Sequence, residues 1–192
     1  MAKKLILAGV VGGVALFLWG GLSHMVLGLG EHGVQYLPQP QPVVAAMKAS
    51  VPGSGLYYFP LTEASGKLTP EQEGGPWGIL VYHASGASMA MSRQLITECI
   101  LNMVQALVAA FLLSLVPGLT GFISRVGFVV AAGLVGAAGL SIEYWNWYGY
   151  PANYTAATIA DKLIGFAIVG LVAAAFIKPA AASLPVERAK AA

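Results

Sequence analysis

Charged residues are scarce in this chain, and their scarcity excludes most soluble folds. Lysine, arginine, aspartate and glutamate make up 9% of the 192 residues, whereas hydrophobic residues make up 57%. A soluble domain typically carries about 25% charged residues, and a globule with so few would expose large apolar patches and aggregate. A lipid bilayer removes this conflict, because hydrocarbon accepts an apolar surface. The net charge of +2 is also too small and too dispersed for a nucleic-acid-binding face.

Cysteine is nearly absent, and the usual catalytic motifs are missing from the sequence. Cys99 is the single cysteine, so the chain can form neither an internal disulfide nor a CxxC redox motif. It lies within an apolar run, where we expect it to pack as a small hydrophobic residue. The sequence contains no HExxH motif, P-loop, dinucleotide-binding fingerprint or kinase signature. These absences favour a non-enzymatic function and require no cofactor.

Four apolar runs are long enough to cross a bilayer, which takes roughly 20 mostly apolar residues. They cover approximately residues 5–27, 95–116, 126–142 and 156–177. Lys3 and Lys4 before the first run are also typical of a secretory signal peptide, but this run exceeds a usual signal core and no small-x-small site follows it. We therefore expect a retained helix. The predicted fold is an all-α membrane protein, a four-transmembrane-helix bundle forming one membrane domain over residues 1–192, with a small α+β extramembrane segment at residues 28–94.

Lysine and arginine in the short flanks of the spans predict the orientation, because cytoplasmic flanks carry an excess of these residues. One side carries Lys3, Lys4, Arg125, Lys178, Arg188 and Lys190 in short flanks. The other side carries Lys48, Lys67, Arg93 and Lys162, spread over much more chain. We therefore expect both termini to be cytoplasmic. The compact chain lacks organelle signals, which favours a bacterial inner membrane with residues 28–94 in the periplasm.

The segment at residues 28–94 is too long for a simple turn. Its pattern predicts a short helix over about residues 42–50, one strand from Gly55 and a second strand from Gly78. Ser88 or Ser92 is the expected cap of the second membrane helix. A lone hairpin is marginally stable in water, so we expect the segment to pack on the helix ends or on a partner. Four spans with a stranded first outer segment resemble claudin-like proteins in topology, but the paired loop cysteines of that group are absent, so no function follows.

Aromatic residues crowd the predicted outer loop between the third and fourth spans, over residues 143–155. They are Tyr144, Trp145, Trp147, Tyr148, Tyr150 and Tyr154. Tryptophan and tyrosine favour the headgroup level of a membrane, where an apolar ring and a polar edge are both satisfied. We interpret the loop as an interfacial anchor. The alternative is an aromatic surface that binds a ligand or a partner.

Ionisable and polar residues gather near the outer ends of the spans. They are His24, Gln94, Glu98, Asn102, Gln105, Glu143, Asp161 and Lys162. Those of the second span are spaced by four, four and three residues, which places them on one helical face that should point into the bundle. Ser23, His24 and Asp161 are the partners expected for that face. Three interpretations remain open: a structural polar network, a cofactor or metal site centred on His24, and a proton or ion relay.

Small residues recur in the first and third spans at spacings that allow close helix contact. Gly9 and Gly13 form a GxxxG pair, and Gly133 and Gly136 belong to small-xxx-small pairs in the third span. These glycines are expected to pack within the bundle or against another subunit. The hypothesis that these features favour is an accessory or interaction subunit of a larger membrane protein complex, whose partners are the lipid bilayer and other membrane subunits. The alternatives are a small transporter or proton-handling protein and a cofactor-binding protein centred on His24.

Overall fold

The computed structural model describes residues 1–61, 66–86 and 91–178, and four long helices dominate it. They are α1 (Ala2–Gly21), α3 (Ser92–Ser114), α4 (Phe122–Tyr148) and α5 (Ala152–Phe176), and a π-helical turn, η1 (Leu22–Val26), extends α1. At about 1.5 Å per residue they are roughly 35 to 40 Å long, against about 30 Å for a bilayer's hydrocarbon core. All four are long and apolar enough to cross a bilayer. The predicted four helices of membrane length are therefore confirmed.

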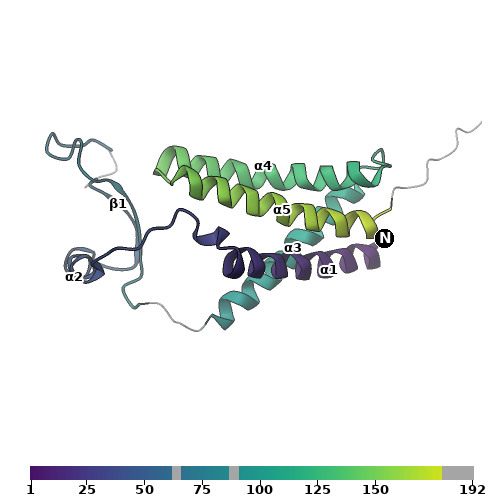
Figure 1. Ribbon diagram of the computed structural model, residues 1–192, viewed down its shortest axis with the longest axis horizontal. Helices are drawn as coiled ribbons and strands as arrows, with labels where there is room; N and C mark the ends of the chain where they lie inside the picture. Colours follow the sequence, from purple (N-terminus) through teal and green to yellow (C-terminus); the bar gives the residue numbers. More distant parts are fainter. Residues whose placement is uncertain (62–65, 87–90, 179–192) are drawn as a thin grey trace, which may run out of the picture.

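The four helices form one antiparallel bundle (Figure 1). α1 packs along α3, α4 packs along α5, and contact between α1 and α5 joins the two pairs. We call the end from which residues 27–91 leave the bundle the hairpin end. The opposite end, where α3 turns into α4, is the tail end, and the start of α1 and the end of α5 both lie there. α3 crosses its neighbours at an angle, so its first turns lie apart from the other helices.

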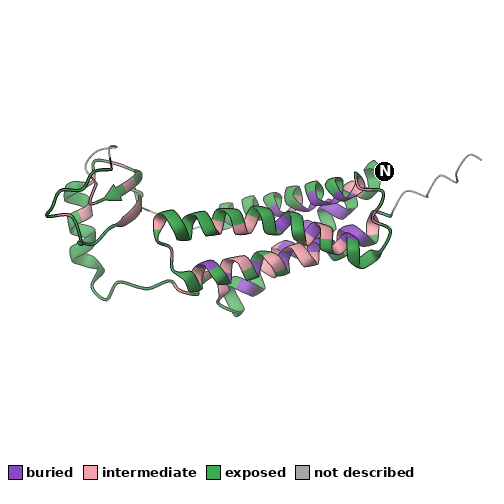
Figure 2. Ribbon diagram, turned by 90° about the horizontal axis from the view of Figure 1, so that it is seen from above, coloured by how far each residue is buried: buried purple, intermediate pink, exposed green. Residues whose placement is uncertain are grey.

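Small side chains fill the contacts between the helices. The buried core includes Ala8, Leu16, Ala106, Ala110, Val129, Val169 and Ala173. Figure 2 shows that the buried residues lie within the bundle. Gly13 of α1 lies directly against the backbone of Met103 in α3, since a Cβ at Gly13 would be 2.3 Å from Met103 Cα. Close backbone approach of this kind is how membrane helices gain van der Waals contact.

The four glycines predicted to pack have different surroundings. Gly9 lies against Leu107 of α3, and Gly133 of α4 lies against the ring of Phe166 in α5. Gly136, in contrast, has no described atom within 4 Å of the position that a Cβ would take. Of the two predicted settings, packing within the bundle does not hold for Gly136, and contact with another subunit stays a prediction.

The connection between α4 and α5 is much shorter than predicted. A third span at residues 126–142 followed by a loop at 143–155 was expected, but α4 continues to Tyr148 and α5 begins at Ala152. Gly149 ends α4 in the left-handed conformation with φ 69°, which suits glycine at this position of a helix end. The prediction was wrong because tyrosine and tryptophan lower the apparent hydropathy of a segment without preventing helix formation.

Residues 27–91 form what we call the hairpin segment, and most of its described residues lie beyond the end of the bundle (Figure 1). The segment contains η2 (Leu29–Glu31), α2 (Pro40–Ser50) and the antiparallel strands β1 (Gly55–Phe59) and β2 (Gly78–Tyr82). The predicted two-stranded sheet is therefore present, with Leu56 opposite Val81. None of the described residues in this segment is buried.

The start of α3 differs from its predicted cap. Met91 occupies the N-cap position without a side-chain hydrogen bond, and Ser92 is the first helical residue. Ser92 is thus not the cap, and Ser88 lies outside the described residues. The first helical N–H groups are left to solvent or headgroups, which is acceptable because the first turn of α3 is exposed.

Candidate functional site

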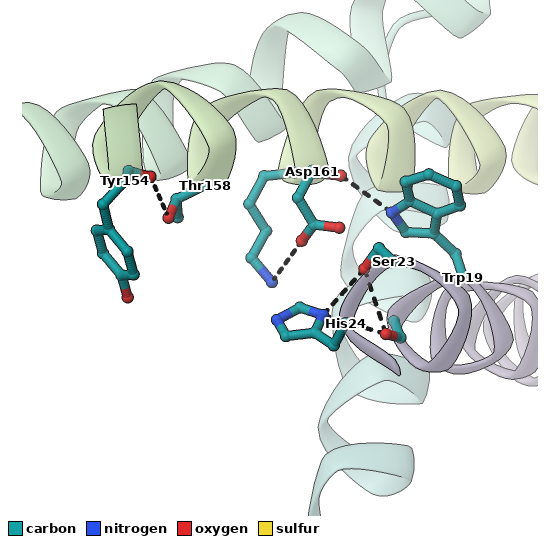
Figure 3. Close-up of polar contacts among 8 residues, drawn as sticks. Trp19, Ser23, His24, Tyr154, Thr158 and Asp161 are labelled. Atoms are coloured by element: carbon teal, nitrogen blue, oxygen red, sulfur yellow. Dashed lines mark hydrogen bonds and ion pairs between the residues drawn. The ribbon is translucent and has the colours of Figure 1, made fainter. Parts of the chain in front are cut away.

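A polar cavity of about 80 Å³ lies at the hairpin end, between the turn after α1 and the first half of α5 (Figure 3). It is lined by His24, Leu29, Gly30, Tyr154, Thr158, Asp161 and Lys162. The structure therefore brings together three of the predicted polar residues, His24, Asp161 and Lys162. The other predicted residues, Gln94, Glu98, Asn102, Gln105 and Glu143, do not line this cavity.

A change in helix type positions His24. The last turn of the first span is a π-helix, in which the Leu27 N–H donates to the Leu22 carbonyl at 3.0 Å. The wider turn rotates the side chains relative to the preceding α-helix, and single π-helical turns are frequent at functional sites. His24 consequently faces α5 rather than continuing the register of α1 (Figure 3).

Hydrogen bonds at the base of the imidazole determine which of its nitrogens carries the proton. His24 Nδ1 lies 3.1 Å from the Gly20 carbonyl oxygen and 2.9 Å from Ser23 Oγ. Ser23 is fully buried, and its hydroxyl donates to the same carbonyl at 3.2 Å. A carbonyl oxygen can only accept, so its contact with Nδ1 requires a proton there. In the neutral ring Nε2 is then an unprotonated acceptor.

Gly30 closes the cavity over the imidazole ring. A Cβ at Gly30 would lie 2.0 Å from His24 Cδ2, so any other residue would displace the histidine. Nothing in the sequence singles out Gly30, because the contact depends on how the chain folds back after η1. A glycine is needed here for close approach, not for backbone freedom.

Asp161 is the buried charged residue of the cavity, with 6% of its surface exposed. Its Oδ2 lies 3.8 Å from the Lys162 ammonium, whose side chain is 46% exposed. Its Oδ1 is buried and has no hydrogen-bond partner in the described structure. The Asp161 backbone carbonyl accepts a hydrogen bond from Trp19 Nε1 at 3.1 Å, which ties α1 to α5 at this level (Figure 3).

The remaining polar wall of the cavity comes from α5. The Thr158 hydroxyl donates to the Tyr154 carbonyl at 2.9 Å, and both residues line the cavity. Sequence reasoning overlooked Thr158, although Tyr154, Thr158 and Asp161 are spaced by four and three residues. That spacing places them on one helical face and would have identified the wall of the site.

The arrangement suits a proton or a small cation better than a metal centre. Asp161 Oδ1 is a buried acceptor without a hydrogen-bond partner, and His24 lines the same cavity as Asp161. Among the described residues, no group of three His, Cys, Asp or Glu side chains is placed to hold a metal ion. A buried carboxylate oxygen without a donor is costly, so we expect a water molecule or a cation to satisfy Asp161.

The polar stripe of α3 does not face the bundle as predicted. Asn102 is buried, but Gln94, Glu98 and Gln105 are exposed. The inclination of α3, whose first half lies apart from the other helices (Figure 1), leaves Gln94 and Glu98 exposed. Ser23, an expected partner of the stripe, instead bonds within its own turn. Glu143 is exposed near the end of α4.

Tyrosine rings form a continuous row from the hairpin segment to the cavity. Ring centroids are 6.2 Å apart for Tyr58 and Tyr148, 5.4 Å for Tyr148 and Tyr144, 5.3 Å for Tyr144 and Tyr150, and 5.6 Å for Tyr150 and Tyr154. These separations are typical of favourable ring pairs. Burial, and to a smaller extent the neighbouring Tyr154 and Tyr144, raise the pKa of Tyr150 above its usual value.

The two predicted tryptophans have a different setting from the tyrosines. Trp145 is 49% exposed and Trp147 is 72% exposed. Exposed tryptophan at the end of a membrane-length helix suits the headgroup level. The predicted aromatic anchor therefore divides into exposed tryptophans and a packed tyrosine row.

The fold and the cavity define a class: a chain with four helices of membrane length and a polar pocket at one end of the bundle. Comparison with protein-family models, with curated proteins and with solved structures gives no match to the chain. Function must therefore be argued from the chain's own surfaces.

Proposed function

We propose that this chain is a non-enzymatic interaction subunit of a larger membrane protein complex, with the hairpin segment as the surface that binds its partner. The observation that carries this proposal is that no described residue of the segment is buried. A two-stranded sheet with one short helix is marginal in water by itself. Such a segment gains a core only when something else covers it.

Both faces of the hairpin are apolar, which supports a protein partner. One face presents Leu56, Tyr58, Ile79 and Val81, and the other presents Tyr57, Phe59, Leu80 and Tyr82. The cross-strand pair Leu56 and Val81 is 60% and 63% exposed. Strands that are apolar on both faces are typical of sheets covered on both sides.

A lipid surface could cover only one of the two faces, and the other would stay in water. A protein partner can cover both, and it can also pair with a free strand edge. The sheet has two such edges, because β1 and β2 pair with each other alone among the described strands. We therefore assign the hairpin to a protein partner instead of the membrane surface.

The experiment is native mass spectrometry of the complex after mild detergent extraction. The double variant Leu56→Ser, Val81→Ser removes the exposed cross-strand pair, and we expect it to lower the amount of bound partner at least about tenfold, the effect of losing a single good apolar anchor. Ile123→Ser is the matched control, because Ile123 is 76% exposed at the tail end of α4. A wild-type chain that extracts as a monomer would contradict the proposal.

The membrane and the orientation belong to the same proposal. We place the chain in a bacterial inner membrane. Both chain termini, and with them the tail end of the bundle, lie in the cytoplasm, and the hairpin segment lies in the periplasm. A single-cysteine series in a Cys99→Ser background tests this. Glu71→Cys should react with a membrane-impermeant maleimide added outside, and Lys178→Cys only after the membrane is opened. Reaction of both from the same side would disprove four crossings.

The cavity at the hairpin end favours a second candidate function, which is proton or cation handling. The supporting observation is that Asp161, whose buried Oδ1 has no hydrogen-bond partner, lines one cavity with His24. Intramembrane ionisable residues commonly mark such pathways.

Proton flux into vesicles containing the purified protein tests this second function. Asp161→Asn keeps the shape of the side chain and should abolish flux, whereas Glu143→Gln, which alters an exposed carboxylate outside the cavity, should leave it unchanged. Equal flux in wild type, Asp161→Asn and empty vesicles would exclude proton conduction by this route.

A further inference from the structure

The tail end of the bundle contains a hollow that the candidate site does not involve. It has a volume of about 70 Å³ and lies where α3 ends, α4 begins and α5 ends. Its polar side chains come from Ser114, Arg125 and Lys178. Met1 and apolar side chains such as Leu113 and Leu119 form the rest of its wall. The sequence indicated Arg125 only as a charge in a short flank between two spans.

Arg125 is buried, with 5% of its surface exposed, although it carries a full charge. Its Nη2 donates to the Ala174 carbonyl oxygen at 2.7 Å. Ala174 is in the last turn of α5, where carbonyl groups lack partners within the helix. The guanidinium therefore completes the end of α5 and opposes the negative end of that helix dipole.

One carbonyl satisfies only part of the guanidinium, which has five N–H donors. No side-chain nitrogen of Arg125 both lacks a hydrogen bond and is completely buried. The nitrogens without a hydrogen bond therefore keep some accessible surface. Since Arg125 lines the hollow, its remaining donors are accessible from that hollow. They are thus available to a ligand that accepts hydrogen bonds.

The charge of Arg125 has no counter-ion within the described residues. Among the described residues, Lys162 pairs with Asp161 at the other end of the bundle. All described carboxylates lie in the hairpin segment or in the helix turns near the hairpin end. The tail end carries Lys3, Lys4, Arg125 and Lys178. A buried charge without a partner is costly, so an anion in the hollow would stabilise this end.

We propose that the hollow binds a phosphate group, namely that of an anionic phospholipid headgroup. Arginine binds phosphate through a planar fork of donors, and Lys178 can add a second charge. The hollow is large enough for a phosphate group but not for a whole lipid. Its position at the end of four membrane-length helices is the headgroup level, and its apolar wall suits the glycerol and first methylenes of a lipid better than a hydrated free ion.

Native mass spectrometry of the delipidated full chain tests this proposal with three probes: phosphatidylglycerol, phosphatidylcholine and inorganic phosphate. We expect phosphatidylglycerol to bind most tightly. Arg125→Gln should weaken it by about tenfold or more, because hydrogen bonds to charged groups are strong. Lys178→Gln should weaken it by about fivefold. Lys48→Gln, in α2 of the hairpin segment, is the charge-matched control and should have no effect.

The outcomes separate the possible sources of the phosphate. Competition by inorganic phosphate at equal concentration would support the phosphate site but overturn its assignment to lipid. Equal binding of the two lipids, or unchanged phosphatidylglycerol binding in both tail-end variants, would overturn the proposal. Lys178 is exposed at the end of α5, so Lys178→Gln should fold normally and gives a result even if Arg125→Gln does not fold.

Discussion

The bundle and the hairpin segment differ in how far their apolar residues are buried, although one chain forms both. In the bundle, small residues such as Ala106, Ala110 and Ala173 are almost completely buried between helices. In the hairpin segment, larger apolar residues such as Leu56 and Trp77 are 60% exposed. The bundle is completed by contacts within the chain, and its outer surface is suited to lipid. The hairpin segment has the residues of a core, but its contacts with the bundle, such as Tyr58 with Tyr148, leave none of its described residues buried.

Exposed apolar surface therefore has two meanings in a chain whose four long helices could cross a membrane. On the outside of helices such as α4, where Val135 is 77% exposed, it is the surface expected in hydrocarbon. On β1 and β2, beyond the end of the bundle, it is surface that water would contact. The following experiments test whether the two regions differ in stability as much as they differ in burial.

The largest expected effect is in amide hydrogen exchange. Amides of α3 around Ala106–Ala110 should exchange at least about a thousandfold more slowly than those of β1 and β2, because buried elements open only by global unfolding whereas exposed pairs open locally. Exchange followed by mass spectrometry in detergent measures both. If the amides of the sheet and of the bundle were equally protected from exchange in the isolated chain, the claim that the hairpin lacks a core would be wrong.

Gly13→Ala should destabilise the bundle strongly. The new Cβ would lie 2.3 Å from Met103 Cα and 2.6 Å from Met103 N, and the backbone cannot move aside without separating α1 from α3. We expect a loss of about 3 kcal/mol, at the upper end of the usual cost of overpacking. Thermal unfolding in detergent, followed by tryptophan fluorescence, measures the change.

Gly136→Ala is the matched control for Gly13→Ala, since a Cβ at Gly136 meets no described atom within 4 Å. Stability should be unchanged or slightly higher, because alanine favours helix more than glycine does. A loss at Gly136 as large as that at Gly13 would show that another subunit packs on this face of α4.

Gly30→Ala should have a smaller and local effect. A methyl group at this position would overlap the His24 ring, so the imidazole must leave its contacts with Ser23 and the Gly20 carbonyl. The cost is about 1 kcal/mol for the lost hydrogen bonding. NMR of histidine-labelled protein should show a shifted His24 signal and an unchanged His83 signal. An unmoved His24 signal would mean that the cavity is not closed as described.

The smallest effect concerns the tyrosine row that joins the two regions. The pKa of Tyr150 is raised from 10.0, chiefly by burial. Its folded pKa therefore exceeds its unfolded value, and the stabilisation it provides is complete below about pH 10 and is lost as the pH rises through the folded pKa. Tyrosinate absorbance of wild type minus Tyr150→Phe should show a component that titrates above pH 10.0. A midpoint below that pH would contradict burial of this ring.

Much of the fold could be predicted because apolar run length is a local property. Any apolar segment of about 20 residues must satisfy its own backbone hydrogen bonds in hydrocarbon, and the helix does so without reference to its neighbours. Short runs of aromatic and aliphatic residues from Gly55 and from Gly78 similarly predicted the two strands. The misplaced end of α4 was an error of the same local kind, since aromatic residues were interpreted as loop.

Which residues line the polar cavity could not be predicted in the same way. Spacing along α3 correctly placed Gln94, Glu98 and Asn102 near one face, but the inclination of α3 decides that only Asn102 is buried. His24 reaches the cavity because of a π-helical turn, and Gly30 closes it because the chain folds back over the ring.

Run length and composition alone predict four helices that can cross a membrane and a short stranded segment after the first. The packing of the helices places His24 and Asp161 in the lining of one cavity and lets Arg125 complete the end of α5, whereas Glu98 and Glu143 do not line that cavity. The physical reason is that helix formation depends on neighbours three and four residues away. A site between helices depends on crossing angles and close approaches that no single segment encodes.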